Sequence, residues 1–328
     1  MNDRVLVTGA PGWLGTRFVQ RLIAQGDSVT CYVHPEEEAS ELPKACRIAR
    51  GDVRDAGGLA EAASETDVVV HLAAVIHTTW TRDYDRINVG GTRNALDAAV
   101  RAGVKRFVFM SSNAAQGSLH GGLIDESGPM RPVSAYGRSK ARGENLVRQY
   151  EGKLSATIIR APMFYGPGQP HRMTRLMRMV QHGRPPVFGR GENLRSMAYL
   201  DNLVDAMMLV LKNEKSRGQV YWIADARPYS TIEVLETIAR VLDVPLRPLY
   251  LPAIIARGCE LADQILERCG YHSLNLHIVG ESTHWIACAC EKARRELGYE
   301  PSVSLEEGLR RAVDWCRHRG LIGDSAKS

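Results

Sequence analysis

The strongest constraint on the fold is a glycine-rich turn that directly follows a short apolar run near residue 5. Val5-Leu6-Val7 is typical of a buried strand, and apolar residues from Phe18 onward recur at helical spacing. Between them stand Gly9, Gly12 and Gly15. Glycines at a strand-to-helix turn allow a tight reversal and a close backbone approach to a phosphate, which the free N–H groups of the helix attract. The turn therefore predicts a phosphate-binding strand–turn–helix unit, although its glycine spacing is three-then-three instead of the usual two-then-three.

The first half of the chain alternates strand-like apolar runs with helical patterns. The runs cover residues 29–33, 68–72, 107–110 and 156–160, and helices are expected from about 59, over 94–102 and over 140–150. Continuous apolar strands between helices are typical of a parallel sheet that is covered on both faces. We therefore predict an α/β fold with a doubly wound parallel sheet of the Rossmann type, followed by a smaller, mostly helical C-terminal substrate domain.

Loop signals after Pro162 suggest where the domains divide. A dinucleotide-binding domain is predicted over 1–168, which also receives 196–225, and a substrate domain over 169–195 and 226–320, with a tail over 321–328. Helices are expected near 203–211, 231–242, 253–267 and 305–318. One side of the 253–267 helix carries Ile254, Leu261, Ile265 and Leu266. We interpret this stripe as a core face of the second domain and not as a surface for a membrane or a partner.

Composition excludes several classes of protein. The net charge of +5 comes from scattered arginines without a dense basic block, which argues against nucleic-acid binding and favours an anionic cofactor or substrate. The seven cysteines are irregularly spaced and form no Cys-x-x-Cys motif, so we predict neither a disulfide framework nor a metal site. A strand begins almost at once, and no apolar stretch is long enough to span a membrane. These features predict a cytoplasmic protein.

A tyrosine and a lysine four residues apart are the first candidates for chemistry. Tyr136 and Lys140 would share a helix face, so that the phenol and the ammonium can enter one site. The nearby ammonium should lower the pKa of the phenol towards its working range for proton transfer. Ser111 and Ser112 follow the 107–110 strand, at the edge where parallel sheets bind ligands.

Several stretches together resemble the extended short-chain dehydrogenase/reductase superfamily, in its NAD-dependent epimerase/dehydratase group. They are Thr8–Gly15, His71–Ala74, Asn88–Thr92 and the set Ser112, Tyr136 and Lys140, followed by 160–168, 199–202 and 297–301. The resemblance covers nearly the whole chain. It implies a catalytic set of Ser112, Tyr136 and Lys140, with Ser111 as the fallback serine. It also implies that Asn88 supports Lys140 through water, a role compatible with capping a helix.

The same resemblance implies a cofactor site. The residues expected to line it are Gly9, Gly12, Trp13, Leu14, Gly15, Asp52, Val53, Ala73, Ala74 and Lys140. One departure concerns the end of the second strand, where members that bind NAD carry an acid and this chain has Val33-His34-Pro35. Without that carboxylate a 2′-phosphate is admissible, and His34, Arg17 or Arg54 can neutralise it. The sequence thus favours NADP over NAD as the cofactor.

The reaction is the least constrained property. Our first hypothesis is an oxidoreductase that moves a hydride between nicotinamide and a carbonyl or secondary alcohol, with Tyr136 as the acid/base. The alternative is a nucleotide-sugar 4-epimerase with tightly bound NAD, and a second alternative is a non-catalytic dinucleotide sensor. A family-type dehydratase fits less well, because Asn113 and Ala114 follow Ser112 where dehydratases carry an Asp-Glu pair. Candidate substrate residues are Ser111, Arg160, His171 and Arg195, with Arg172 beside them. Similar proteins are commonly homodimers.

Overall fold

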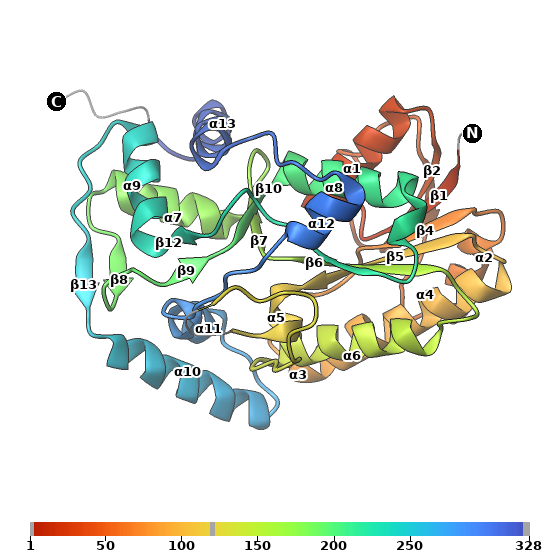
Figure 1. The fold of residues 1–328 in the computed structure, drawn as a ribbon, viewed down its shortest axis with the longest axis horizontal. Coiled ribbons are helices and arrows are strands. Elements are labelled where there is room, and N and C mark those ends of the chain that lie inside the picture. Colours follow the sequence, from red (N-terminus) through yellow and green to blue (C-terminus); the bar gives the residue numbers. More distant parts are fainter. Residues whose placement is uncertain (1–2, 119–121, 324–328) are drawn as a thin grey trace.

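A seven-stranded parallel sheet organises the computed structural model, which describes residues 3–118 and 122–323 (Figure 1). The strand order is β11-β6-β5-β4-β1-β2-β3, and every neighbouring pair runs parallel. The strands are β1 (Arg4–Thr8), β2 (Ser28–Val33), β3 (Arg47–Arg50), β4 (Val68–His71), β5 (Arg106–Ser112), β6 (Ala156–Ala161) and β11 (Val220–Trp222). This order reverses between β1 and β4, which creates the crevice where doubly wound sheets bind their ligands.

Helices cover both faces of the sheet. On one face α1 (Trp13–Ala24) and α8 (Leu200–Lys212) pack against Val5 and Val7. On the other face α2 (Ala56–Ala63), α4 (Gly90–Arg101) and α6 (Ala135–Gln149) share a core with Leu6. Successive residues of β1 thus enter opposite cores, as the pleat of a strand requires. The prediction of a doubly wound Rossmann sheet is confirmed, although α2, α4 and α6 each begin three to five residues earlier than expected.

A second, mostly helical region stands beside the sheet. Its core joins α7 (His171–Gln181), α9 (Thr231–Leu242) and α13 (Leu305–His318). Three separate strand pairs accompany these helices: β7 (Met163–Tyr165) with β10 (Met197–Tyr199), β9 (Leu194–Arg195) with β12 (Tyr229–Ser230), and β8 (Pro186–Phe188) with β13 (Leu249–Leu251). At its edge lie α10 (Ala253–Arg268) and α11 (Leu274–Glu281) (Figure 1).

Shorter elements complete the chain. They are α3 (Thr81–Asp83), a π-helical turn over Tyr84–Val89, α5 (Asn113–Gln116), a 3-10 turn over Glu214–Ser216 and α12 (Glu291–Leu297). Residues of α12 return to the core beneath α1 and α8. Of the helices in the described ranges, none combines the length and apolar character that a bilayer crossing requires.

The apolar stripe of α10 contradicts the sequence prediction. Ile254 is 67% exposed, Leu261 60% and Ile265 51%, so this side is not a core face. The buried side of the helix carries Asp263 and Glu267 instead. Both carboxylates have partners on neighbouring segments, as described below, so polar contacts fix this helix where periodicity predicted apolar packing.

Candidate functional site

The glycine turn forms a cradle that excludes side chains. Gly9 has φ +82°, and a Cβ there would stand 2.6 Å from the backbone nitrogen of Ala73. A Cβ on Gly12 or Gly15 would stand 2.8 Å or 2.6 Å from the carbonyl oxygen of Gly9. Among the described residues no side chain caps the first turn of α1, so its N–H groups remain available to an anion. The chain at this turn fits a pyrophosphate.

Trp13 ties the glycine turn to the beginning of the helical region. Its indole nitrogen donates a 2.7 Å hydrogen bond to the carbonyl oxygen of Pro167, and its ring packs 5.0 Å from that of Phe164. Trp13 and Leu14 also line the cavity described below. The contact joins two segments that are far apart in the sequence on one side of the site.

Beyond the carboxyl ends of β2 and β3, the Asp52 carboxylate contacts two of the basic residues that were expected to neutralise a 2′-phosphate, His34 and Arg54. Nε2 of His34 lies 3.2 Å from Oδ2 of Asp52, and Nε of Arg54 donates to the same oxygen at 2.8 Å. The hydrogen bond from Arg54 lowers the pKa of Asp52 to about 2. Arg17 pairs with Asp201 on α8 and does not line the cavity. Arg17 is therefore not placed to neutralise a 2′-phosphate, contrary to our expectation.

The predicted acid/base set comes together at the ends of β5 and α6. The Ser112 hydroxyl hydrogen-bonds the Tyr136 side chain, and the Lys140 ammonium lies 4.7 Å from the ring centre of Phe109. Burial raises the pKa of Tyr136 to about 12, against a smaller lowering by the Ser112 hydrogen bond. Burial lowers the pKa of Lys140 to about 8. The expected lowering of the phenol pKa by the ammonium and a positive nicotinamide ring is therefore not seen in the chain alone, where desolvation dominates.

Asn88 lies inside the π-helical turn and caps no helix, so the interpretation of Asn88 as a helix cap is wrong. Its amide nitrogen donates to the carbonyl oxygen of Val75 and to the hydroxyl of Ser139, both at 3.0 Å. Its amide oxygen accepts from the N–H of Val75 at 2.8 Å. Asn88 therefore joins the loop that follows β4 to α6, one residue before Lys140, while its own side chain is outside the cavity lining.

Arg160 is not a substrate contact. Its side chain is 1% exposed and donates to both carboxylate oxygens of Glu144, at 2.9 and 2.8 Å. Glu144 also accepts a 2.6 Å hydrogen bond from Ser111. These contacts hold the Arg160 guanidinium in the protein core, outside the cavity. Ser111 does line the cavity, but its hydroxyl is directed to Glu144, so Ser112 is the serine beside the phenol.

A charged wall faces the phenol from the helical region. Arg172 and Arg195 line the cavity, and burial lowers the pKa of both guanidinium groups. Nη2 of Arg195 lies 3.8 Å from Oε2 of Glu281. Burial alone would raise the pKa of Glu281, but His277 and the two arginines lower it to about 2. His171, at the start of α7, also lines the cavity.

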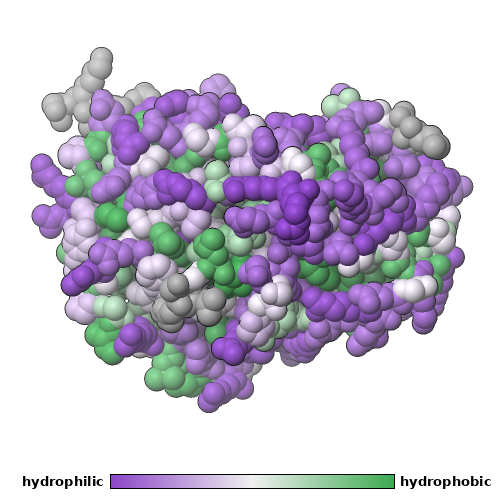
Figure 2. Space-filling view, in the orientation of Figure 1, coloured by the Kyte–Doolittle hydropathy of each residue, from purple (hydrophilic) through white to green (hydrophobic). Residues whose placement is uncertain are grey.

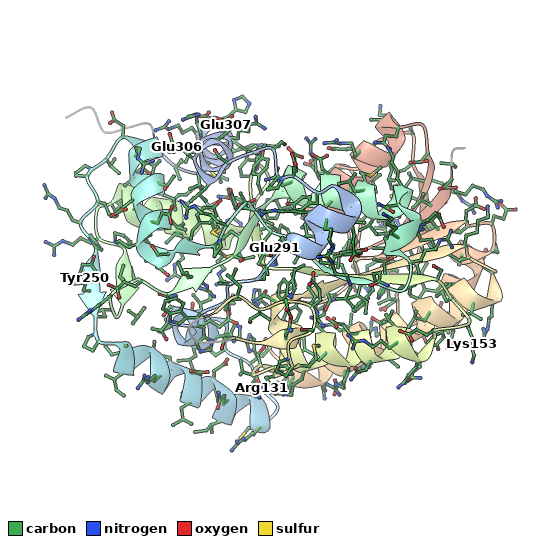
Figure 3. All side chains as sticks on the ribbon, viewed as in Figure 1. Arg131, Lys153, Tyr250, Glu291, Glu306 and Glu307 are labelled. Carbon is green, nitrogen blue, oxygen red and sulfur yellow. The ribbon has the colours of Figure 1, made fainter. Side chains whose placement is uncertain are left out.

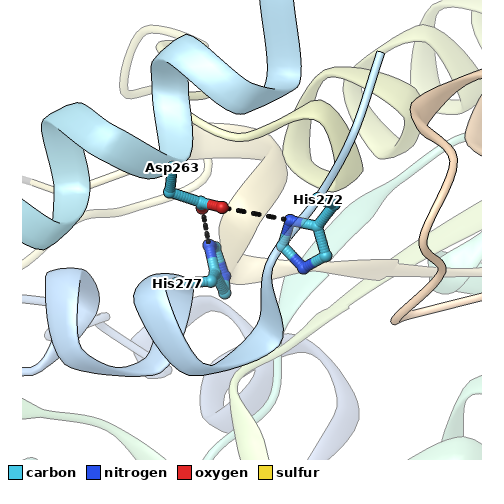
Figure 4. A group of neighbouring side chains, drawn as sticks. All are labelled: Asp263, His272 and His277. Atoms are coloured by element: carbon cyan, nitrogen blue, oxygen red, sulfur yellow. Dashed lines mark hydrogen bonds and ion pairs between the residues drawn. The ribbon is translucent and has the colours of Figure 1, made fainter. Parts of the chain in front are cut away.

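An imidazole cluster continues this wall (Figure 4). Asp263 lies 3.1 Å from Nδ1 of His277, whose Nε2 lies 3.3 Å from Glu281. Burial alone would lower the pKa of His277, but hydrogen bonds to these two carboxylates raise it to about 9. Nδ1 of His272 lies 3.6 Å from both Asp263 and Glu267. The three residues of Figure 4 are close enough to share a metal ion, yet both nitrogens of His277 already contact carboxylates.

Sequence reasoning did not single out His77, His272, His277 or Glu281, all of which line the cavity. The only local signal is the four-residue spacing of His277 and Glu281, which places them on one face of α11. Their partners come from α10 and β9, so their proximity depends on the tertiary fold.

One cavity of about 960 Å³ unites these groups. It runs along the carboxyl ends of the strands, and residues from α1, β2, β5, α6, α7 and α11 line it together with the loops that follow β1 and β4. The predicted residues along its wall are Gly9, Gly12, Trp13, Leu14, Gly15, His34, Asp52, Val53, Ala73, Ala74, Ser111, Ser112, Tyr136, Lys140, His171 and Arg195. The space extends from the glycine turn, past a phenol and an ammonium, to two partly buried arginines.

Comparison with known proteins agrees with this arrangement. The model of the "NAD dependent epimerase/dehydratase family" matches residues 5–224. The chain belongs to this family. An uncharacterized protein of Sinorhizobium fredii, y4nL, is 37% identical, with 96% of each chain covered. The N-acetyl-alpha-D-glucosaminyl-diphospho-ditrans,octacis-undecaprenol 4-epimerase of Escherichia coli O157:H7 is 33% identical over 77% of this chain and 76% of its own length.

Among solved structures, a dTDP-glucose 4,6-dehydratase from Streptomyces venezuelae with NAD and TYD bound is 28% identical. It has a TM-score of 0.77, with 97% of this chain and 98% of that chain covered. This epimerase/dehydratase family member is therefore an enzyme of the extended short-chain dehydrogenase/reductase type, and its family is NAD-dependent. The prediction of NADP as the cofactor finds no support in these comparisons.

Proposed function

We propose that this protein is an NAD-dependent 4-epimerase of a sugar carried on a diphosphate. The observation that carries the proposal is the pair of partly buried arginines, Arg172 and Arg195, in the same cavity as Tyr136 and Lys140. Cations withdrawn from water are costly without an anion, and Glu281 is the carboxylate that contacts Arg195. In the described part of the chain Arg172 has no carboxylate within ion-pair distance. A diphosphate would supply the missing negative charge.

The acid/base chemistry follows from Tyr136 and its neighbours. NAD, when bound, supplies the hydride acceptor and donor and a positive ring that favours the phenolate. As C4 of the sugar loses its hydride, the C4 hydroxyl gives its proton to Tyr136, and the C–O bond becomes a carbonyl. Return of the hydride to the other face is accompanied by return of that proton. Ser112 holds the oxygen beside the phenol, and the positive charge of Lys140 stabilises the phenolate.

The simple reductase that we favoured from the sequence has less support. It rested on a loosely held NADP, and the groups expected to neutralise a 2′-phosphate have other partners. His34 and Arg54 contact the ionised Asp52, so the negative charge that would repel a 2′-phosphate lies at this end of the cavity. We therefore propose NAD as the cofactor. A non-catalytic dinucleotide sensor would not require an acid/base set such as Ser112, Tyr136 and Lys140 beside an anion site.

The test is turnover with a panel of UDP- and dTDP-hexoses in the presence of NAD, followed by NMR at C4. We expect interconversion of the C4 epimers without net formation of NADH, and tighter binding of NAD than of NADP. Tyr136→Phe should lower kcat by about 10²- to 10⁴-fold. Tyr150→Phe, at the other end of α6, is the matched control and should retain activity. Stoichiometric NADPH consumption with simple ketones would restore the reductase hypothesis.

The anion site has its own test. Arg172→Gln removes a partly buried cation from the cavity wall, so we expect KM for the diphosphate-linked sugar to rise by about 10- to 100-fold. Arg175→Gln, an exposed position on the same helix, is the matched control. An unchanged KM in Arg172→Gln would argue that the substrate carries no diphosphate at this wall.

A further inference from the structure

Helix α10 turns its acidic residues inward and its large apolar residues outward. Glu260 lies 3.2 Å from His284 and Asp263 lies 3.1 Å from His277. Glu267 accepts the N–H of Ala135 at 2.8 Å, at the start of the helix that carries Tyr136. A helix on the surface of a globular protein usually has the opposite polarity. The outward face of α10 therefore has the character of a covered surface.

The apolar area extends beyond the helix. We define the α10 surface as the exposed residues of β13 and α10: Leu249, Tyr250, Ile254, Ile255, Leu261 and Ile265. Hydrophobic residues gather over this corner, at the lower left of Figure 2, and Tyr250 lies at the same edge in Figure 3. Of the thirteen large apolar side chains exposed among the described residues, ten lie on this surface or beside its C-terminal end. Such a concentration marks an interaction site more often than chance exposure.

The neighbouring part of the surface leads to the mouth of the cavity. Tyr271 follows α10, and its ring lies 4.7 Å from that of Trp80. Leu274 and Ile76, three and four residues from this aromatic pair, are exposed and also line the cavity. Apolar residues thus continue from the α10 surface to the opening through which a substrate enters.

The charges on the α10 surface are of one sign. Arg247, Arg257 and Arg268 are exposed, and within the described ranges none of them contacts an acid. The acids of residues 247–268 are the three that α10 turns inward. A second copy of the chain, bound by the same face, would oppose arginines to arginines without a carboxylate to neutralise them. A negatively charged, partly apolar partner fits both properties.

We propose that the α10 surface docks on an anionic lipid bilayer. Isoleucine, leucine and tyrosine side chains would enter the boundary between headgroups and acyl chains, while the arginines contact the headgroup phosphates. No described helix can cross a bilayer, so the contact is peripheral. Docking would hold the cavity mouth beside the headgroups. If the proposed function holds, the substrate is then a sugar joined by its diphosphate to a membrane lipid.

Vesicle sedimentation of the 328-residue chain tests the docking itself. We expect it to pellet with phosphatidylcholine vesicles that contain phosphatidylglycerol, far less with pure phosphatidylcholine, and less as salt is raised. The double variants Ile254→Gln/Leu261→Gln and Arg257→Gln/Arg268→Gln should each weaken binding by at least about tenfold. Ile48→Gln and Lys153→Gln are the apolar and basic controls, and Lys153 lies at the opposite end of the molecule (Figure 3).

Turnover of a soluble nucleotide sugar by the same variants separates the two proposals. The α10 variants should keep the parental activity in solution, which shows that they fold, while failure of every protein to turn over both the soluble and a lipid-linked diphosphate sugar would count against the epimerase alone. Three results overturn the docking: no sedimentation of the parent protein, equal sedimentation with neutral vesicles, or unchanged sedimentation of both double variants. A lipid-independent dimer that Ile254→Gln/Leu261→Gln dissociates, without sedimentation, would assign the surface to a second copy and also overturn it.

Discussion

His277 stabilises the folded state because its protonated imidazole contacts two carboxylates. Asp263 and Glu281 contact its two ring nitrogens and raise its pKa from 6.5 to about 9. The folded state thus binds this proton more tightly than the unfolded chain does. The resulting stability is fully present below about pH 6.5 and is lost as pH rises towards 9. Folding and the charge of the cavity wall are coupled through one residue.

We predict that His277→Gln lowers the free energy of unfolding by about 2 kcal/mol or more at pH 6, and by clearly less at pH 9.5. Urea unfolding at the two pH values measures the difference between the parent and the variant. His318→Gln, an exposed histidine on α13, should match the parent at both. A His277→Gln effect of the same size at both pH values would show that the imidazole is held there neutral.

At the scale of elements, the β1–α1 turn leaves no room for side chains. A Cβ on Gly15 would approach the Gly9 carbonyl oxygen to 2.6 Å and the Ala10 Cα to 3.0 Å. We predict that Gly15→Ala destabilises the protein by about 1–3 kcal/mol and abolishes measurable NAD binding. Gly90→Ala, with its nearest atom at an ordinary 3.6 Å, should leave both unchanged or raise stability slightly. Thermal unfolding and NAD titration test the pair, and equal effects would contradict the steric argument.

Local spacing determined how much of the site was predictable. Gly9, Gly12 and Gly15 belong to one turn, and Tyr136 and Lys140 belong to one helix. Local sequence spacing was therefore enough to predict that the members of each group lie close together. The predictions that Arg160 contacts the substrate and that Arg17 contacts a 2′-phosphate were wrong, because the carboxylate partners Glu144 and Asp201 come from other elements.

The α10 stripe failed for a related reason. Periodicity identifies an apolar face but does not say which side the rest of the chain covers. Here Asp263 and Glu267 find partners on α11 and α6, and their contacts decide which side of the helix is buried. Only the assembled fold contains that information.

At the scale of the whole molecule, the large sheet is completed by a segment that follows the first part of the helical region. After α7 and the short strands, α8 packs against α1, and β11 pairs with β6 at the edge of the sheet. Trp222 of β11 is fully buried, and its indole nitrogen donates to Gln116 at 3.0 Å. Residues 1–168 therefore contain six strands of the sheet but lack its last strand and one of its covering helices.

We predict that a fragment of residues 1–168 does not unfold cooperatively by itself, because the α1 face and the β6 edge would both be exposed to water. Circular dichroism should show reduced structure and a broad thermal transition, where the full chain gives a sharp one. Co-expression with residues 169–328 should restore a soluble complex, since the missing strand and helix are then supplied in trans. A sharp, NAD-dependent transition in the fragment alone would mean that six strands suffice, and that β11 and α8 only extend an already stable sheet.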